Sequence, residues 1–179
     1  MKGLDISLLA GDTGAALLAD NGAEGVMNPV LITAATEAEK EWAASVMAGS
    51  EPWITLGRSL ESCLEICRRP EYQVFVARQG RQLCGFVVLV RRGVAGSPYI
   101  ASIAVAEGSR GSGVGSRLLE FAEDLFRATA RHIFLCVSSF NLRARALYER
   151  RGYEAVGEFK DYVIDGASEI LMHKRLVKS

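Results

Sequence analysis

The segment EGSRGSGVGSRLLEF, residues 107–121, constrains the fold of this chain more than any other stretch of its sequence. It places Gly111, Gly113 and Gly115 at alternate positions directly after Arg110, and an apolar helical pattern begins at once. Glycine has no Cβ and permits positive φ angles, so glycines at the start of a helix let a ligand approach the backbone closely. A tight turn and a plain flexible loop are the alternatives, and the surrounding sequence has to decide between them.

Apolar residues on both sides of this segment predict a β-loop-α-β unit. A β-rich run over 98–105 precedes the loop, helical spacing extends over 113–129, and an apolar strand follows over 132–138. In such a unit the loop delivers a ligand to the helix N-terminus. Free backbone N–H groups and about half a positive charge favour anions there. The sequence therefore predicts an anion site at the start of this helix.

The remaining patterns predict further helices and strands in one α/β domain over 29–179. Residues 1–28 are dominated by Gly, Ala and Asp and are expected to form an N-terminal extension. Asn141 is expected to cap a short helix that ends at Gly152. The other predicted elements are a strand over 28–36, helices over 37–49 and 54–69, a hairpin of strands over 72–78 and 83–91, and final strands over 153–164 and 168–173.

Charge and composition exclude several classes of partner. The 179 residues include 21 Lys and Arg against 21 Asp and Glu, and 49% of them are hydrophobic. Without a net charge there is no global field to attract nucleic acid or an anionic membrane, so an anionic ligand needs a local site. No apolar run approaches the ~20 residues of a membrane span, and the N-terminus does not resemble a signal peptide. A cytoplasmic location is expected.

The four cysteines predict neither a metal site nor disulfides. Cys63 and Cys67 lie four positions apart on a predicted helix, which is compatible with a shared metal, but no His or acidic pair has ligand spacing. Cys84 and Cys136 lie inside apolar strand patterns. Small buried residues in a reducing compartment are the better interpretation.

Two familiar phosphate loops do not fit the glycine segment. The P-loop requires a lysine after its last glycine, and no lysine occurs between Lys40 and Lys160. The dinucleotide fingerprint G-x-G-x-x-G requires its third glycine where Ser116 stands. The spacing that does fit is Arg-x-x-Gly-x-Gly, from Arg110 to Gly115. It resembles the pyrophosphate-binding signature of the GNAT superfamily of acetyl-CoA-dependent N-acetyltransferases.

Two longer segments extend this resemblance. IAVAEGSRGSGVGSRLLEFAE resembles the strand, loop and long helix of the superfamily, and NLRARALYERRGYEAVG resembles its second signature. The resemblance covers residues 30–175. It implies the GNAT fold, of the α/β (α+β) class: a mixed sheet of six to seven strands, splayed between the central parallel pair, with helices on both faces. It also implies acetyl-CoA as acyl donor and no metal.

The resemblance assigns cofactor contacts to three segments. The loop Arg110, Gly111, Ser112, Gly113, Val114, Gly115 and Ser116 would wrap the CoA pyrophosphate with backbone amides. The backbone of Ile103, Ala104 and Val105 would bind the pantetheine arm, and the Val105 N–H would polarise the thioester carbonyl. Asn141 would contact the cofactor or an ordered water in addition to its role as N-cap, and the small Ala144 would leave room for the thiol end.

Tyr148 is the predicted catalytic residue, since resemblance puts its hydroxyl near the departing sulfur as general acid. A core tyrosine on an amphipathic helix is the alternative. Many relatives carry a glutamate on the central strand, but Ala101 and Ser102 stand in the corresponding places. Candidate bases are left unranked: Glu51, Asp161, His132 and His173. A water chain, or an acceptor amine of pKa near ~8, would make a dedicated base unnecessary.

The acceptor is an amine, and its identity stays open. The last third of the chain resembles protein N-terminal acetyltransferases, including those that act on ribosomal-protein alanine. This likeness gives Tyr162 and Asp161 as acceptor contacts, and Trp53 either lines the acceptor site or anchors its loop. Three hypotheses follow: acetylation of a peptide α-amine, acetylation of a small amine, and a CoA-binding regulatory domain without turnover. A homodimer is one of the assemblies open to the chain.

Overall fold

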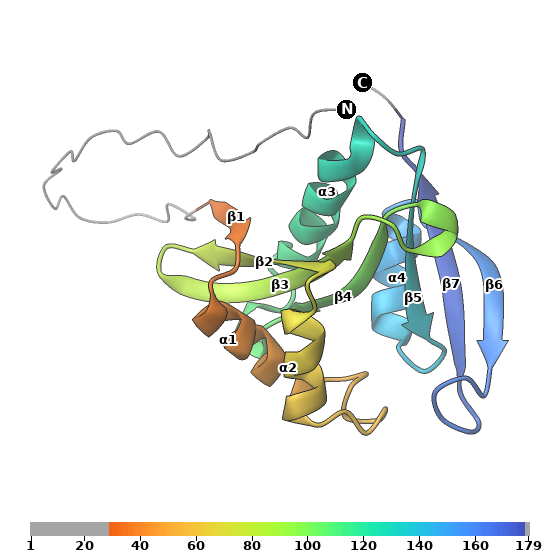
Figure 1. Ribbon diagram of the computed structural model, residues 1–179, viewed down its shortest axis with the longest axis horizontal. Helices are drawn as coiled ribbons and strands as arrows, with labels where there is room; N and C mark the ends of the chain where they lie inside the picture. The colour runs from red at the N-terminus through yellow and green to blue at the C-terminus, as the bar shows by residue number, and fades with distance from the viewer. Residues whose placement is uncertain (1–28, 178–179) are drawn as a thin grey trace, which may run out of the picture.

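The computed structural model of the protein describes residues 29–177, which form a mixed sheet with helices on both faces (Figure 1). The seven strands have the order β1-β2-β3-β4-β5-β7-β6, and all neighbours are antiparallel except β4 and β5. The predicted extension over 1–28 lies outside the described residues. The elements are β1 (Val30–Ala34), α1 (Glu37–Ala48), α2 (Leu60–Arg68), β2 (Tyr72–Gln79), β3 (Gln82–Val90), β4 (Tyr99–Val105), α3 (Val114–Arg127), β5 (His132–Ser138), α4 (Leu142–Arg150), β6 (Glu154–Lys160) and β7 (Ser168–Arg175).

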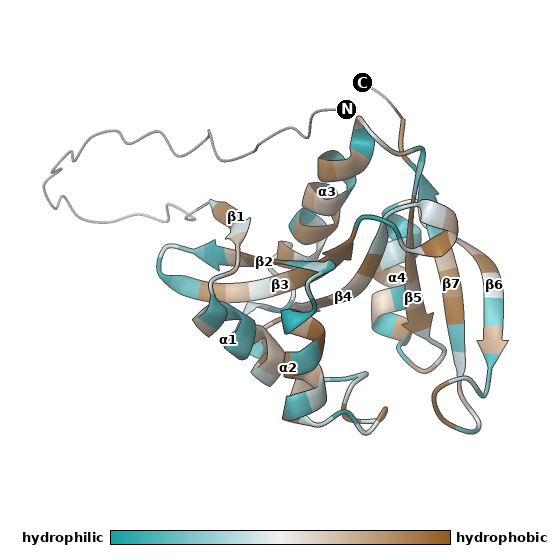
Figure 2. Ribbon diagram, viewed as in Figure 1, coloured by the Kyte–Doolittle hydropathy of each residue, from teal (hydrophilic) through white to brown (hydrophobic). Residues whose placement is uncertain are grey.

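The strand β3 separates two hydrophobic cores. Its residues alternate between the faces of the sheet, so Phe86 and Val88 pack beneath α1 and α2, while Val87 and Leu89 pack beneath α3. All four side chains are fully buried. Figure 2 shows hydrophobic residues along β4 and β5 and hydrophilic residues on the outer side of α1. A strand covered on both faces needs a continuous apolar run, which is why 83–91 lacks a polar alternation.

The parallel pair at the centre of the sheet separates, as the resemblance predicts. β4 pairs with β5 at only two positions, Tyr99 with Phe134 and Ile100 with Leu135. Beyond Ile100, β4 stays paired with β3 up to Val105, while β5 continues to Ser138 beside β7. The two strands therefore leave a gap between their C-terminal halves.

Two boundaries differ from the sequence prediction by more than two residues. The second helix begins at Leu60 rather than at residue 54, because Gly57 has a φ of +64° that ends helical propagation and Ser59 caps the helix by accepting from the Ser62 amide. The penultimate strand ends at Lys160, since Asp161 adopts a φ of +50° and starts a turn. Both are local backbone features that apolar periodicity does not report.

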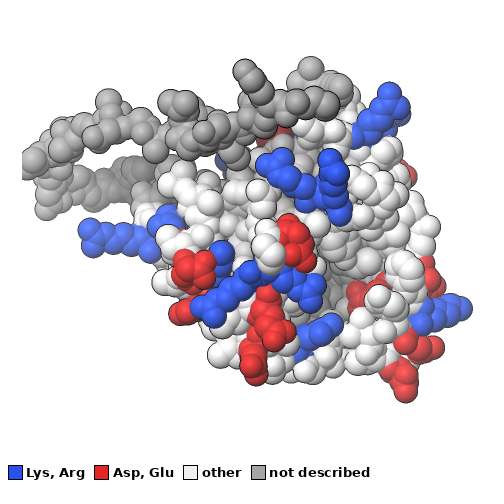
Figure 3. Space-filling model, viewed as in Figure 1, with Lys and Arg blue, Asp and Glu red and all other residues white. Residues whose placement is uncertain are grey.

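The described residues carry neither a membrane helix nor a metal cluster. No helix among them is long and apolar enough to cross a bilayer. Within residues 29–177, no three His, Cys, Asp or Glu side chains gather closely enough to hold a metal ion. Figure 3 shows positive and negative side chains interspersed on the face in view.

Candidate functional site

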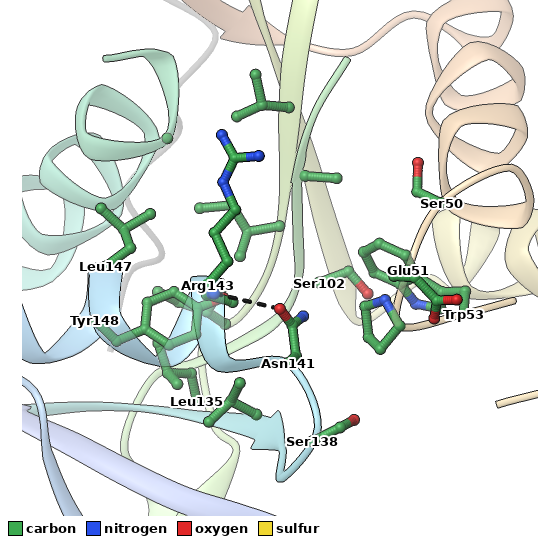
Figure 4. Close-up of a pocket in the computed structure, with 18 of the residues that line it drawn as sticks. Ser50, Glu51, Trp53, Ser102, Leu135, Ser138, Asn141, Arg143, Leu147 and Tyr148 are labelled. Carbon is green, nitrogen blue, oxygen red and sulfur yellow. Dashed lines mark hydrogen bonds between the residues drawn. The ribbon is translucent and has the colours of Figure 1, made fainter. Parts of the chain in front are cut away.

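A cavity of about 830 Å³ opens where β4 and β5 separate. Its walls come from the end of β4, the glycine loop and the start of α3, the end of β5, helix α4, and the loop between α1 and α2. Tyr148 and Leu147 lie on one side in Figure 4, and Glu51 and Trp53 lie on the opposite side. The volume is within the range of small-molecule and cofactor sites.

The three glycines of the loop serve two different purposes. Gly111 and Gly113 have φ angles of +83° and +86°, and a Cβ at either position would meet no atom within 4 Å. Glycine is required there by the backbone conformation. Gly115 lies inside α3, and a Cβ on it would come within 3.2 Å of Leu147 Cδ2 and 3.5 Å of Val105 Cγ2. Glycine at this position lets α4 approach α3 closely.

The N-terminus of α3 is free to receive an anion. Gly113 is its N-cap and offers no side chain, and the first turn contains no acidic residue. The first backbone N–H groups of a helix have no intrahelical acceptor, so those at Val114, Gly115 and Ser116 remain available to a ligand. Ser112 stabilises the loop by donating its hydroxyl proton to Ser109 O at 2.6 Å. The groups predicted to bind an anion at this position are therefore backbone N–H groups.

Three arginines line the same cavity as this helix N-terminus: Arg110 from the glycine loop, and Arg143 and Arg150 from α4. Arg110 also donates its Nε–H to Val105 O across 3.5 Å, which ties the loop to the end of β4. Backbone amides, the helix dipole and guanidinium groups therefore all favour negative charge in this cavity.

The end of β4 offers free backbone to the gap. Ile103, Ala104 and Val105 line the cavity. They pair with β3 on one side, whereas the pairing with β5 has already ended at Ile100. The edge of β4 that faces the gap is therefore available to hydrogen-bond an extended ligand, in the same way as an added strand would.

Helix α4 brings Asn141, Ala144 and Tyr148 to the cavity. Asn141 caps the helix as predicted, since its Oδ1 accepts from the Ala144 N–H at 3.2 Å (Figure 4). Gly152 ends it with a φ of +83°. Tyr148 is 6% exposed, and its burial raises the pKa of the phenol above the ordinary value. The hydroxyl therefore keeps its proton throughout the neutral range.

Trp53 anchors its loop and also lines the cavity. Its ring lies 6.4 Å from that of Phe86, which anchors the α1–α2 loop to the core, and the residue also lines the cavity. Glu51 lies in the same loop and accepts from the Thr55 amide at 3.3 Å. One wall of the cavity is thus held by an aromatic contact beneath it.

Four sequence candidates lie apart from the cavity lining. Asp161 accepts from the Gly166 amide at 2.7 Å and shapes the β6–β7 turn, and Tyr162 is 72% exposed beside Phe159. His132 and His173 face each other on β5 and β7 with their Nδ1 atoms 3.1 Å apart. The structure does not bring these four residues to the gap between β4 and β5.

Glu169 lines the cavity, and sequence reasoning missed it. Because β7 pairs with β5, Glu169 lies directly opposite Ser138, whose hydroxyl donates to Glu169 Oε1 at 2.5 Å. The sequence presents this glutamate only as one polar residue at the start of a strand. A prediction that β7 inserts between β5 and β6 would have identified it, and local periodicity contains no such information.

The fold and the cavity define a class of protein that holds an elongated anionic ligand between two splayed parallel strands. A GNAT resemblance predicts this arrangement, and the family model for the acetyltransferase (GNAT) family matches residues 36–153. The chain belongs to the acetyltransferase (GNAT) family.

Individual relatives agree with this assignment. An uncharacterized N-acetyltransferase from Methanocaldococcus jannaschii is 37% identical over 82 residues, which is 45% of this chain and 53% of that protein. The chain therefore matches about half the length of this curated relative. The ribosomal-protein-S18-alanine N-acetyltransferase from Escherichia coli has a TM-score of 0.68 at 20% identity, covering 84% of this chain and 96% of that one. A GNAT family acetyltransferase from Elizabethkingia anophelis with acetyl-CoA bound has a TM-score of 0.67 at 18% identity, covering 82% and 98%.

Proposed function

We propose that the protein transfers the acetyl group of acetyl-CoA to a primary amine, by direct attack of the amine on the thioester while both substrates are bound. The observation that carries this proposal is the meeting of three features in one cavity: a free helix N-terminus behind Gly113, the unpaired edge of β4, and the hydroxyl-bearing Tyr148. Each suits a different part of acetyl-CoA.

The residues of the cavity fit acetyl-CoA along its length. The backbone amides of Val114 to Ser116, with Arg110, would bind the pyrophosphate. The free edge of β4 from Ile103 to Val105 would bind the amides of the pantetheine arm. This would bring the thioester toward α4, where Ala144 contributes little volume beside Tyr148. The Val105 N–H would polarise the carbonyl oxygen, which acquires negative charge as the amine attacks.

Tyr148 would assist departure of the thiolate. The phenol keeps its proton because burial raises its pKa, so it is a poor donor of a full proton and a dependable hydrogen-bond donor to the sulfur. As charge develops on the sulfur, this hydrogen bond would strengthen. Proximity of the two substrates and polarisation of the carbonyl would supply the rest of the rate enhancement. A covalent enzyme intermediate is not required.

For the acceptor we propose the α-amine of a protein or peptide. The ribosomal-protein-S18-alanine N-acetyltransferase shares the fold over 96% of its length, which supports an acceptor of this kind. Asp161 and Tyr162, in the turn between the last two strands, would contact residues beyond the terminal amine. A small-molecule amine is the alternative acceptor, and the wall formed by Glu51 and Trp53 would then enclose it.

The test is release of free thiol from acetyl-CoA with a panel of acceptors: peptides with small N-terminal residues, lysine peptides, polyamines and aminoglycosides. Tyr148→Phe should lose most of the activity and keep CoA binding. Tyr153→Phe is the matched control, because Tyr153 is equally buried, its ring lies 6.0 Å from that of Tyr148, and it does not line the cavity. If CoA raises the melting temperature but no acceptor releases thiol, the result favours a CoA-binding regulatory domain over an acceptor outside the panel.

We also propose a cytoplasmic location. All four cysteines are unpaired, and Cys63, Cys67 and Cys84 are buried. Free thiols used as small core residues are typical of proteins in reducing compartments.

A further inference from the structure

We propose that Glu169 accepts the proton that the acceptor amine must lose, with Ser138 holding its carboxylate in position. The inference rests on the function proposed above and names the base for that reaction. An amine is protonated near neutral pH, since α-amino groups titrate near ~8 and lysines near ~10.4. Only the unprotonated form can attack a thioester, so a nearby proton acceptor increases the reactive fraction.

Three carboxylates line the cavity in the described part of the chain, and they differ in position. Glu107 precedes Arg110 at the phosphate end, away from the expected thioester. Glu51 is exposed and accepts from an amide of its own loop. Glu169 is half-buried on the interior strand β7, where pairing with both β5 and β6 holds its backbone. It alone combines a rigid backbone with a place beside the gap between the parallel strands.

Ser138 orients the Glu169 carboxylate. Ser138 is 2% exposed, and its hydroxyl donates to Glu169 Oε1 at 2.5 Å. No other side-chain hydrogen bond reaches this carboxylate within the described residues, so Oε2 can accept from a ligand. Since the serine donates and the carboxylate only accepts, the pair is already arranged to bind an ammonium group.

Glu169 lies opposite Ser138 at the end of β5, and its charge extends to the branch point of the two parallel strands. Burial is the main cause of the raised pKa of Tyr99 and of Cys136, and the negative charge of Glu169 is a further cause for both. Tyr99 is one of the two β4 residues that pair with β5, and Cys136 directly follows Leu135, the last β5 residue that pairs with β4. Both side chains line the cavity. Glu169 therefore acts electrostatically where the gap begins.

The proposed step balances as follows. The ammonium gives one proton to Glu169, and the amine lone pair then forms a C–N bond at the thioester carbonyl. The C–S bond breaks and the sulfur leaves as a thiolate. The nitrogen loses its second proton, and the thiolate takes up one proton to become the free thiol. Glu169 returns its proton to solvent. The net products are the acetylated amine, free CoA and one proton.

The experiment compares Glu169→Gln, Ser138→Ala and the control Glu158→Gln, with an acceptor on which the wild type is active. Glutamine preserves the size of the side chain and its ability to accept from Ser138. Glu158 lies on the neighbouring strand β6, exposed and outside the cavity lining. General-base catalysis contributes about 10²–10⁴-fold. We expect Glu169→Gln to lower kcat/KM at least ~100-fold near neutral pH, Ser138→Ala to lower it less, and Glu158→Gln to leave it unchanged.

The pH profile distinguishes a base from a structural residue. The deficit of Glu169→Gln should shrink as the pH approaches the pKa of the acceptor, because solution then supplies unprotonated amine, and the KM for acetyl-CoA should stay constant. A deficit that is independent of pH, a raised KM for acetyl-CoA, or equal activity of the variant would overturn the role of Glu169. The same holds if Glu51→Gln alone shows the pH-dependent loss. A wild type that releases no thiol with any amine overturns the proposed function itself.

Discussion

Replacing Gly113 by alanine should weaken CoA binding in addition to destabilising the fold. Gly113 has a φ of +86° at the N-cap of α3 and lines the cavity, and a Cβ there would meet no protein atom within 4 Å. The added methyl group therefore enters open space beside the cavity, where the proposed function places the pyrophosphate. Gly96 is the matched control, because it has a φ of +77°, equally open surroundings and no part in the cavity lining.

The two variants should lose a similar amount of folding stability and differ in their affinity for CoA. A non-glycine residue in the left-handed region costs roughly 1–2 kcal/mol, so both Gly113→Ala and Gly96→Ala should lose about that much stability. For a domain of this size, that lowers the melting temperature by about 2–8 °C. A hydrogen bond to a charged group contributes about 1.5–3 kcal/mol. Loss of one such bond to the pyrophosphate in Gly113→Ala raises the Kd for CoA by about 10- to 150-fold.

Calorimetric titration with CoA and thermal unfolding measure the two quantities separately. We expect both variants to unfold at similarly reduced temperatures, while only Gly113→Ala loses affinity. An unchanged Kd in Gly113→Ala would refute the assignment of the glycine loop to the phosphates. An equal loss of affinity in Gly96→Ala would show that general destabilisation, and not the loop geometry, controls binding.

Two further predictions concern stability. Glu123 is 2% exposed and pairs with Lys174 at 2.6 Å and with Arg151 at 3.7 Å. Lys174→Met should therefore lower the free energy of unfolding, measured in urea, by about 3–5 kcal/mol. Adding Glu123→Leu to this variant should recover most of the lost stability. An additive double variant would contradict this coupling. Burial raises the pKa of Cys67 to about 11. The stabilisation from the buried neutral thiol is therefore complete below the ordinary thiol pKa of ~8.5 and is lost as the pH rises to about 11. Cys67→Ala should flatten the fall in unfolding free energy over that interval. An unchanged slope would exclude Cys67 as the cause of the fall.

Local patterns identified most of the elements that build the site. The glycine spacing, the cap at Asn141 and the stop at Gly152 are all observed, because each depends on the backbone needs of a few neighbouring residues. The same patterns misplaced the start of α2, where Gly57 and Ser59 override an apolar run. They also assigned one purpose to three glycines, although Gly115 is there for Leu147, a contact between helices far apart in sequence.

The candidate base shows most clearly where sequence reasoning ended. The sequence leaves four candidate bases unranked. Three of them, His132, His173 and Asp161, lie outside the cavity lining, and Glu51 lines the cavity from an exposed loop. Glu169 is not among the four. Its position depends on β7 lying between β5 and β6. The order of the strands along the sequence does not indicate this insertion.

The sequence by itself determined the family, the β-loop-α-β unit, and the glycine turn, helix cap and helix stop beside the cavity, because glycine φ angles, helix caps and apolar periods are properties of short segments. Only the tertiary structure decided the strand order, the residues at which β4 and β5 part, and the meeting of Ser138 with Glu169. These features arise from pairing between distant segments, whose free energy depends on which surfaces are buried together across the whole sheet.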